Sequence, residues 1–373
     1  MDSGWSSPAV IAKLVIGILF IDTFVIQEHD SYGESPLIYA KLHPSEDVLI
    51  LTDTGTNSPH DPSLPSSKLK EYLEIYPVEA NRYRPLNPRD PRTNEPARKY
   101  IVICTHCHYD HIGGIAAFAA NRSIEVVAPA GGKEFITHDL ETHSLCKFLH
   151  PPIKPPKYDV TKWASDGEVL SHGNNKLSIQ ILHTPGHTPD SLAWYDISER
   201  HLYIGDTFYE RGPDDMPIIF PKEGSWVDYM ASLQKLLNFV RYHNNDSSQH
   251  SRYGGVTSWL GCFGLEGASW LDAWMGRVVQ GRVSLAAGHQ TSDVDAEQAL
   301  EEVVVLFKRI LKGEVKQQDV GMNRGEQVCF WQDPDDGAGE GARFSVKAPL
   351  RLVEEARKHF GGGEKMFEML YGP

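Results

Sequence analysis

Four side chains that can bind metal ions stand within the six residues from His106 to His111. They follow an apolar stretch that predicts a buried strand, and a Gly-Gly pair that begins a small-residue helix comes next. On an extended backbone, residues two apart point to the same side, so His106 and His108 can share one ion. The chain then turns, which lets Asp110 and His111 face a neighbouring position. The cluster therefore predicts a metal site.

Three further candidate ligands fall where predicted strands end, namely His187, Asp206 and His289. Pro185 and Gly186 force a tight loop that projects the ring of His187. Each of the three is weak evidence alone, because a single histidine at a strand end is usually part of hydrogen-bonded structure. Together with the cluster they complete two sites. Three histidines with an open position fit one ion, and a carboxylate with two histidines fits the other, with a carboxylate able to bridge them.

Nitrogen and oxygen ligands without a thiolate predict two Zn²⁺ ions, and they also admit Mn²⁺, Fe²⁺ or Co²⁺. Cys107 lies between two candidate ligands and should point away from them into the protein interior. His183, four residues before His187, is expected to support its loop rather than bind metal. The chain has only five cysteines, widely scattered, and we expect free thiols in a reducing compartment.

The elements that must position these residues mix strands and helices without strict alternation. Apolar stretches predict strands directly before each group of candidate ligands. Amphipathic helices are predicted after a Ser225 cap, over 296–311 and over 349–360. This mixture predicts an α/β or α+β layered protein whose site lies at one edge of a sheet.

Residues 10–26 are apolar enough to suggest a signal peptide or a membrane anchor. However, Lys13 and Asp22 interrupt the run, which is shorter than the roughly 20 residues that a membrane span needs. Its Val, Ile and Phe content, broken by Gly17, predicts two strands joined by a tight turn. We therefore expect no membrane association and a cytoplasmic protein.

The bulk composition of the 373 residues is that of an ordinary globular protein, with 40% hydrophobic residues. The net charge of −14 would repel a phosphate backbone, so no nucleic-acid partner is expected. We predict a single domain over 1–373, with surface insertions near 58–98 and 243–268 and a mixed α/β extension after 290. The sequence leaves open whether two copies pair as a homodimer.

The residues and the order of these motifs resemble those of the metallo-β-lactamase superfamily. The resemblance rests on the His106–His111 cluster, the TPGH loop at His187, the GDT after the strand at Asp206 and the late GH at His289, with a DTG turn upstream at Asp53–Gly55. It implies a four-layer αββα sandwich with the metals at one edge of the sheets.

The resemblance also implies a role for each candidate ligand. His106, His108 and His187 would bind the first metal. Asp110, His111 and His289 would bind the second. Asp206 would bridge the two metals, and Asp53 would steady a ligand histidine.

Tyr209 falls three residues after Asp206, where lactonase-like members of this superfamily carry a tyrosine aimed at the substrate carbonyl. Its phenol could donate a hydrogen bond to the developing oxyanion, although a core or lid tyrosine is the alternative. The stretch 211–226 follows directly, and its Met216, Ile218, Ile219, Phe220 and Trp226 could wall an apolar pocket or belong to a simple buried loop.

These features predict a dinuclear metallo-hydrolase that opens a small cyclic ester or cyclic amide, a lactonase or lactamase of the kind that detoxifies xenobiotics. A hydroxide held between the metals would attack the substrate carbonyl, and Asp110 would help to move the proton. A glyoxalase-II-like thioester hydrolase is the alternative, weakened because the tail shows no clear basic cluster. A phosphodiesterase or nuclease ranks third because of the acidic charge, and an inactive metal-binding module ranks last.

Overall fold

The first sheet is formed by strands that lie between Ile11 and Ala164. The computed structural model describes residues 11–14 (backbone only), 23–59, 68–119, 124–213, 215–245, 281–332 and 342–361. The first sheet has seven strands in sequence order: β1 (Ile11–Leu14), β2 (Thr23–Gln27), β3 (Leu37–Leu42), β4 (Val48–Thr52), β5 (Lys99–Ile103), β6 (Glu125–Pro129) and β7 (Lys162–Ala164). Strands β1 to β4 are antiparallel, and β4 to β7 are parallel.

The second sheet has six strands, in the order β14-β13-β11-β10-β9-β8. These are β8 (Val169–His172), β9 (Asn175–His183), β10 (Leu192–Asp196), β11 (His201–Tyr203), β13 (Ser284–Ala286) and β14 (Val294–Asp295). All neighbours are antiparallel except β11 and β13, which are parallel.

The alternation of side chains along the strands produces three cores. Strand β5 directs Ile101 and Ile103 between the two sheets, where they join Trp194 of β10. Its intervening residues face the opposite way, into a core under the helices that flank the first sheet. Strand β5 is therefore buried on both faces, which requires a helical layer outside the first sheet.

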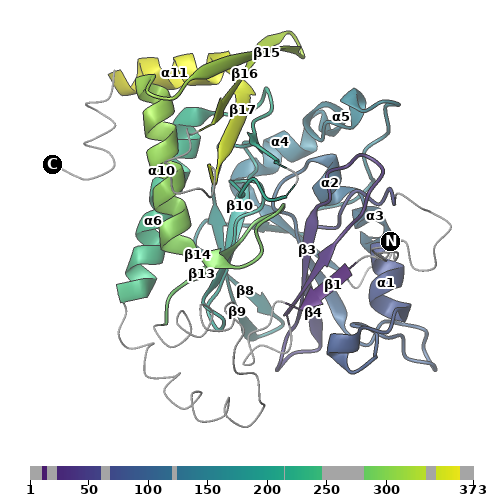
Figure 1. Ribbon diagram of the computed structural model, residues 1–373. Helices are drawn as coiled ribbons and strands as arrows, with labels where there is room; N and C mark the ends of the chain where they lie inside the picture. Colours follow the sequence, from purple (N-terminus) through teal and green to yellow (C-terminus); the bar gives the residue numbers. More distant parts are fainter. Residues whose placement is uncertain are drawn as a thin grey trace, which may run out of the picture.

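Those helical layers lie on the two outer sides of the sheets, as Figure 1 shows. Short helices cover the first sheet: α1 (Leu69–Ile75), α2 (Tyr109–Ile112), α3 (Ile115–Ala119), α4 (Lys133–Thr137) and α5 (Leu140–His143), with 3₁₀ turns η1 (Glu79–Asn81), η2 (Ala130–Gly132) and η3 (Cys146–Phe148). Two long helices, α6 (Trp226–Asn245) and α10 (Ala296–Lys312), cover the second sheet. The predicted four-layer αββα sandwich is confirmed.

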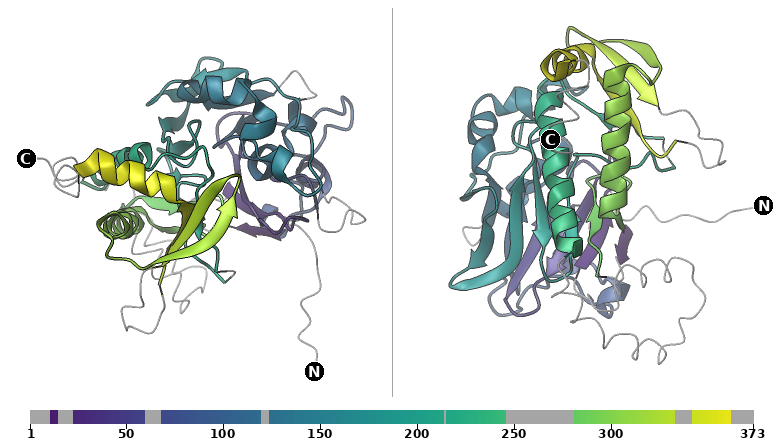
Figure 2. Two further views of the ribbon diagram at one scale, coloured as in Figure 1. Left: turned by 90° about the horizontal axis from the view of Figure 1, so that it is seen from above. Right: turned by 90° about the vertical axis from the view of Figure 1, so that its left-hand side faces the viewer.

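A third, four-stranded sheet lies at one end of the sandwich, with helix α11 (Leu350–Phe360) beside it (Figures 1 and 2). Its order is β12-β17-β16-β15, from β12 (Ile218–Ile219), β17 (Ser345–Pro349), β16 (Glu326–Gln332) and β15 (Gln317–Asn323). Strand β12 comes from the middle of the chain and pairs parallel with β17 near the C-terminus. The C-terminal part of the chain is thereby joined to the segment just after Asp206.

The predicted helices are confirmed: Ser225 Oγ accepts a hydrogen bond from the Asp228 amide at the start of α6, at 3.3 Å. The two strands predicted within 10–26 are β1 and β2, which pair antiparallel, and their connection lies outside the described residues. Most of the predicted 243–268 insertion also lies outside them. Within the part of the chain that the structure describes, no helix is both long and apolar enough to cross a bilayer.

Candidate metal centre

Five strands end at the same edge of the sandwich, and each is followed by a candidate site residue. In the first sheet, parallel β4 and β5 precede Asp53 and His106. In the second sheet, β9, β11 and β13 run in one direction and precede His187, Asp206 and His289. The two edges are joined by a hydrogen bond from the Leu192 amide to the Thr105 carbonyl, at 2.8 Å. The candidate residues therefore lie together at one edge of the sandwich.

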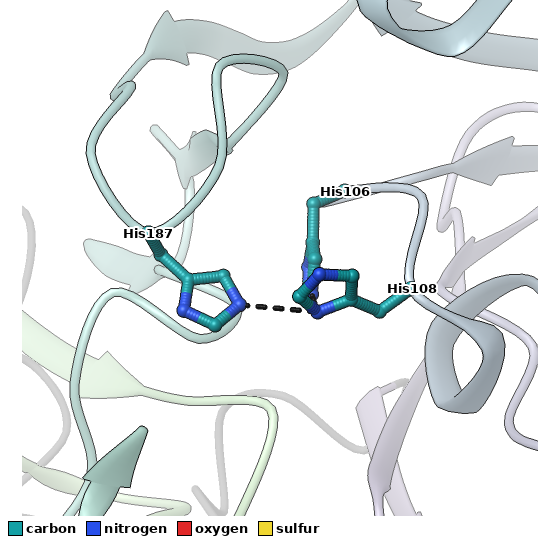
Figure 3. Close-up of side chains that lie close together, drawn as sticks. All are labelled: His106, His108 and His187. Atoms are coloured by element: carbon teal, nitrogen blue, oxygen red, sulfur yellow. Dashed lines mark hydrogen bonds between the residues drawn. The ribbon is translucent and has the colours of Figure 1, made fainter. Parts of the chain in front are cut away.

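His106, His108 and His187 form the first group of candidate ligands. Figure 3 shows the loop of His187 approaching the other two rings from the opposite side. His108 Nδ1 lies 2.9 Å from His106 Nε2 and 3.2 Å from His187 Nε2. Ligands about 2.0–2.1 Å from a tetrahedral ion are spaced by roughly 3.3 Å, so these separations suit one shared cation.

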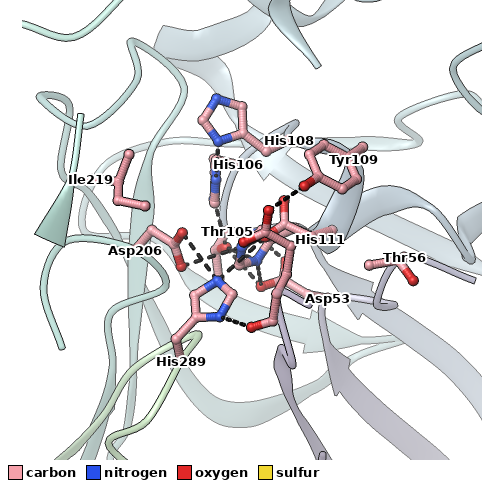
Figure 4. Close-up of polar contacts among 12 residues, drawn as sticks. Asp53, Thr56, Thr105, His106, His108, Tyr109, His111, Asp206, Ile219 and His289 are labelled. Carbon is pink, nitrogen blue, oxygen red and sulfur yellow. Dashed lines mark hydrogen bonds and ion pairs between the residues drawn. The ribbon is translucent and has the colours of Figure 1, made fainter. Parts of the chain in front are cut away.

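Asp110, His111, Asp206 and His289 form the second group, shown with its polar contacts in Figure 4. His289 Nε2 lies 3.3 Å from Asp110 Oδ2 and 3.4 Å from Asp206 Oδ2. His111 Nε2 lies 3.4 Å from Asp110 Oδ2 and 3.2 Å from Asp206 Oδ1. All seven side chains of the two groups are buried.

The ring nitrogens that face away from the two groups are held by other parts of the chain. His187 Nδ1 lies 2.9 Å from the Ile219 carbonyl oxygen, and His289 Nδ1 lies 2.9 Å from the Glu34 carbonyl oxygen. A carbonyl accepts, so each Nδ1 carries the proton and leaves Nε2 free to bind a metal.

The Asp53 carboxylate contacts two residues of the histidine-rich segment, Thr105 and His111. Its carboxylate accepts hydrogen bonds from the Thr105 amide and hydroxyl, both at 2.7 Å, and lies 2.8 Å from His111 Nδ1. The Thr105 hydroxyl in turn lies 3.2 Å from His106 Nδ1. Asp53 adopts φ 62°, a left-handed conformation that is tolerated mainly by Gly, Asn and Asp. One carboxylate therefore orients a histidine of each group.

Gly288 makes room for the second group. A Cβ atom at this position would lie 2.4 Å from Asp206 Oδ1 and 2.8 Å from His111 Cε1. Any side chain here would push apart two candidate ligands, which explains the Gly-His dipeptide at the end of β13.

The two groups differ in charge. Burial, together with neighbouring His187, lowers the pKa of His108 to about 3, so the first group consists of neutral rings. Burial alone would also lower the pKa of His289, but the Asp206 and Asp110 carboxylates raise it to about 10. Burial would raise the pKa of Asp206, yet His111 and His289 hold it well below its usual range. The second group therefore attracts positive charge, which protons supply when no metal is bound.

Buried atoms without hydrogen bonds test whether metal ions fit. His111 Nε2 and Asp206 Oδ1 are buried and lie 3.2 Å apart, at ion-pair distance, yet neither makes a hydrogen bond to any residue that the structure describes. Unpaired buried polar atoms are costly, and a shared cation between them would satisfy both. Together with the neutral ring nitrogens of the first group, they form a dinuclear metal site.

A cavity of about 160 Å³ opens onto both groups. Its ligand wall includes His108, Asp110, His187, Asp206 and His289. Its apolar wall includes Met216, Ile219 and Phe220, as predicted, whereas Ile218 and Trp226 are buried in the core.

Tyr209 lines this cavity, with its ring centroid 5.3 Å from that of His289. Its hydroxyl accepts a hydrogen bond from the Ile219 amide at 3.4 Å. The phenol proton therefore has no acceptor among the described residues and can be donated into the cavity.

The neighbouring residues behave as the sequence predicts. Cys107 is buried in the core outside the first sheet, away from the ligands. His183 Nε2 lies 2.9 Å from the Pro189 carbonyl oxygen and supports its loop. The four described cysteines are free thiols.

Glu34 and the Ile219 backbone were not predicted from the sequence. The Glu34 side chain is hydrogen-bonded to the Tyr109 hydroxyl and lines the cavity, while its carbonyl holds His289. Burial, followed by repulsion from Asp110, raises the pKa of Glu34 to about 7.

Comparison with known proteins identifies the family. Residues 45–241 match the model of the metallo-beta-lactamase superfamily. The protein avaE of Aspergillus versicolor, provisionally named a transcription factor, is 34% identical over 194 residues, which cover 51% of this chain and 55% of avaE. The chain therefore spans about half the length of that relative.

A thioesterase and a hydrolase are among the relatives that carry enzyme names. The acyl-coenzyme A thioesterase MBLAC2 of Bos taurus is 28% identical, over 56% of this chain and 69% of its own. A hydroxyacylglutathione hydrolase of Nitrosomonas eutropha is 32% identical, over 36% and 41%. The family match covers more than half of this chain, which belongs to the metallo-β-lactamase superfamily. Its two groups of buried ligands could each hold a metal ion.

Proposed function

We propose that this chain opens a small cyclic ester or cyclic amide, as a lactonase or lactamase. The observation that carries the proposal is the cavity itself, because both groups of ligands and the Tyr209 hydroxyl face one small, partly apolar space. A small carbonyl compound can reach the metals and the phenol together in such a space.

Each ligand has a proposed role. The first metal is held by His106, His108 and His187. The second is held by Asp110, His111 and His289. Asp206 would bridge the two metals, as the family resemblance implies; its Oδ1 lies 3.2 Å from His111 Nε2 and its Oδ2 lies 3.4 Å from His289 Nε2. Zn²⁺ suits this set of nitrogen and oxygen ligands, and Mn²⁺, Fe²⁺ and Co²⁺ are the competing ions.

When bound, the two metals supply Lewis acidity and acidify water at neutral pH. The residues around them do the positioning and the proton transfer. The Tyr209 hydroxyl donates its free proton in a hydrogen bond to the carbonyl oxygen as negative charge develops there. Asp110 takes up a proton from the attacking water and returns it to the leaving oxygen or nitrogen. The apolar wall around Ile219 and Phe220 keeps bulk water from the reacting carbonyl.

A thioester hydrolase is the second candidate. One of the two relatives given above is named an acyl-coenzyme A thioesterase and the other a hydroxyacylglutathione hydrolase. The tail sequence shows no basic cluster, which weakens this candidate. In the folded chain, however, Arg324 of the β15–β16 turn and Lys347 of β17 both line the cavity. We propose a single folding unit over 1–373 in both cases, because β12 and β17 share one sheet.

The experiment is a comparison of initial rates of the metal-loaded chain on a γ-lactone, a γ-lactam, a β-lactam, a thioester and a phosphodiester. We expect the lactone or lactam to be the best substrate. A clear preference for the thioester would promote the second candidate, and a preference for the phosphodiester would contradict both.

A further inference from the structure

Three cationic side chains line the same cavity as the metal ligands: Lys222, Arg324 and Lys347. They come from three separate places, namely the loop after β12, the turn between β15 and β16, and strand β17. The chain as a whole carries a net charge of −14, so a gathering of cations at its cavity is against the general trend.

Nearby carboxylates balance these cations only in part. Arg324 pairs through both terminal nitrogens with Glu223, at 2.7 Å for Nη1. Lys222 Nζ lies 3.8 Å from Glu326, which also accepts from Arg351. Lys347 is exposed and has no ion-pair partner within the described ranges of the chain.

Arg324 also has an incomplete set of contacts. Its guanidinium stacks over the Phe148 ring, 4.0 Å from the centroid, but its Nε atom is buried and makes no hydrogen bond within the described part of the chain. It adopts φ 49° in the turn before Gly325, an uncommon conformation for an arginine. The β15–β16 hairpin thus places at the cavity a guanidinium whose terminal nitrogens pair with Glu223, while its Nε–H has no hydrogen-bond acceptor among the described residues.

The cavity therefore combines three kinds of wall. The metal ligands form one part, and residues such as Ile219 and Phe220 form an apolar part. Lys347 adjoins the apolar part, because it pairs with Ile219 in the sheet and its carbonyl accepts from the Phe220 amide at 2.9 Å. A compound that fills the cavity would place its carbonyl at the metals and its far end near the lysines.

We propose that Lys347 and Lys222, with Arg324 beside them, form a subsite for an anionic group on the substrate, a carboxylate or a phosphate. This inference rests on the proposed hydrolysis of a small carbonyl compound and adds that the substrate is negatively charged at a distance from the scissile bond. The subsite distinguishes substrates by their charge, and the C-terminal sheet positions its residues. The metal ligands, in contrast, belong to the αββα sandwich.

The test compares γ-butyrolactone with the same lactone bearing a γ-carboxylate, and S-acetyl-2-mercaptoethanol with S-acetyl-3-mercaptopropionate. A phosphate ester in place of the carboxylate forms a further arm. The metal-loaded full chain, Lys347→Gln, the double variant Lys222→Gln/Lys347→Gln and the control Lys358→Gln are measured. Lys358 is exposed on α11 and does not line the cavity.

The readout is the ratio of kcat/KM for the anionic substrate to that for its neutral partner. Exposed charge pairs contribute modestly, so Lys347→Gln should lower this ratio by about two- to fivefold and the double variant by about tenfold. The effect should shrink as salt is added, and Lys358→Gln should behave as the wild type. An equal ratio in the wild type and the double variant, or the same fall in Lys358→Gln, would overturn the subsite.

Calorimetric binding of the same compounds separates this inference from the proposed function. If no lactone or thioester is hydrolysed, the proposed function fails. The subsite then stands if the anionic compound binds the wild type more tightly than the double variant, and it falls if the two affinities are equal.

Discussion

The Nδ1 atom of His187 lies 2.9 Å from the backbone carbonyl oxygen of Ile219. The amide of the same Ile219 donates to the Tyr209 hydroxyl. Since Ile219 pairs with Lys347 of β17, the C-terminal sheet holds the strand that orients both a candidate ligand and the proposed oxyanion donor. The part of the chain after 290 is thus connected to the chemistry through one backbone segment.

Removing the phenol of Tyr209 tests its proposed role. Tyr209→Phe should lower kcat by about 10–100-fold, less than the loss of a sole oxyanion donor, because a metal shares that work. KM should change little, since ground-state binding rests on the cavity walls. Metal content measured by elemental analysis should stay at the wild-type level. Wild-type turnover of the best substrate would make Tyr209 a wall residue only.

The bridging role of Asp206 predicts an effect on both metals. Asp206→Asn should weaken both sites together, because one carboxylate offsets the repulsion between two cations. His187→Ala should remove mainly the metal of the first group. Titration with Co²⁺, followed by its absorption spectrum, would distinguish the two patterns. Full retention of both metals and of turnover in Asp206→Asn would refute the bridge.

Asp53 offers a variant that keeps the backbone conformation. Asn tolerates the left-handed φ of this position, so Asp53→Asn should fold normally while its amide holds His111 and Thr105 less well. Loss of such a supporting carboxylate should weaken metal binding by about 10–100-fold. Competition with a chelator measures the affinity, and thermal unfolding of the metal-free protein is the control. Unchanged affinity would show that Asp53 serves the fold alone.

The gathering of the candidate ligands at one sheet edge could be predicted from the sequence, because His106, His187, Asp206 and His289 each come shortly after an apolar strand. The backbone groups that orient these ligands could not be predicted from the sequence. Ile219 and Glu34 act through backbone carbonyls, which every residue type carries, so no letter in the sequence marks them. Strand β15 was also missed, because all seven of its residues are exposed and it shows no apolar alternation.

The cations of the cavity were missed for a different reason. Lys222 lies more than a hundred residues before Arg324 and Lys347 in the sequence, and the third sheet brings the three together. A search for a basic run in the tail cannot detect such a group. The layered α/β class followed from local patterns and the four-layer sandwich from the family resemblance, whereas this subsite depends on the pairing of β12 with β17.

Glu28 provides a prediction for stability that is independent of the metals. Burial raises its pKa from 4.5 to about 7, although the Thr56 amide donates to it. A carboxyl group whose pKa is higher in the folded than in the unfolded protein destabilises the fold when it is ionised. The destabilisation caused by Glu28 therefore grows as the pH rises from about 4.5 to about 7, and it is constant above that range.

Glu28→Gln should relieve this cost. The variant should gain up to about 3 kcal/mol over the wild type at pH 8, since each pKa unit corresponds to about 1.4 kcal/mol, and the gain should shrink as the pH approaches 5. Urea unfolding of the metal-free proteins at several pH values measures it, with the exposed Glu354→Gln on α11 as the control. A gain that does not vary with pH would contradict the assigned pKa.

The central claim is that hydrolysis requires two metal ions in this site. Metal-free protein should be titrated with Zn²⁺ while the initial rate on the best lactone, lactam or thioester is followed. We predict no turnover without metal, a rate that rises until two equivalents per chain are bound, and recovery of the metal-free state on chelation. Full activity at one equivalent, or turnover that persists in metal-free protein, would contradict the account.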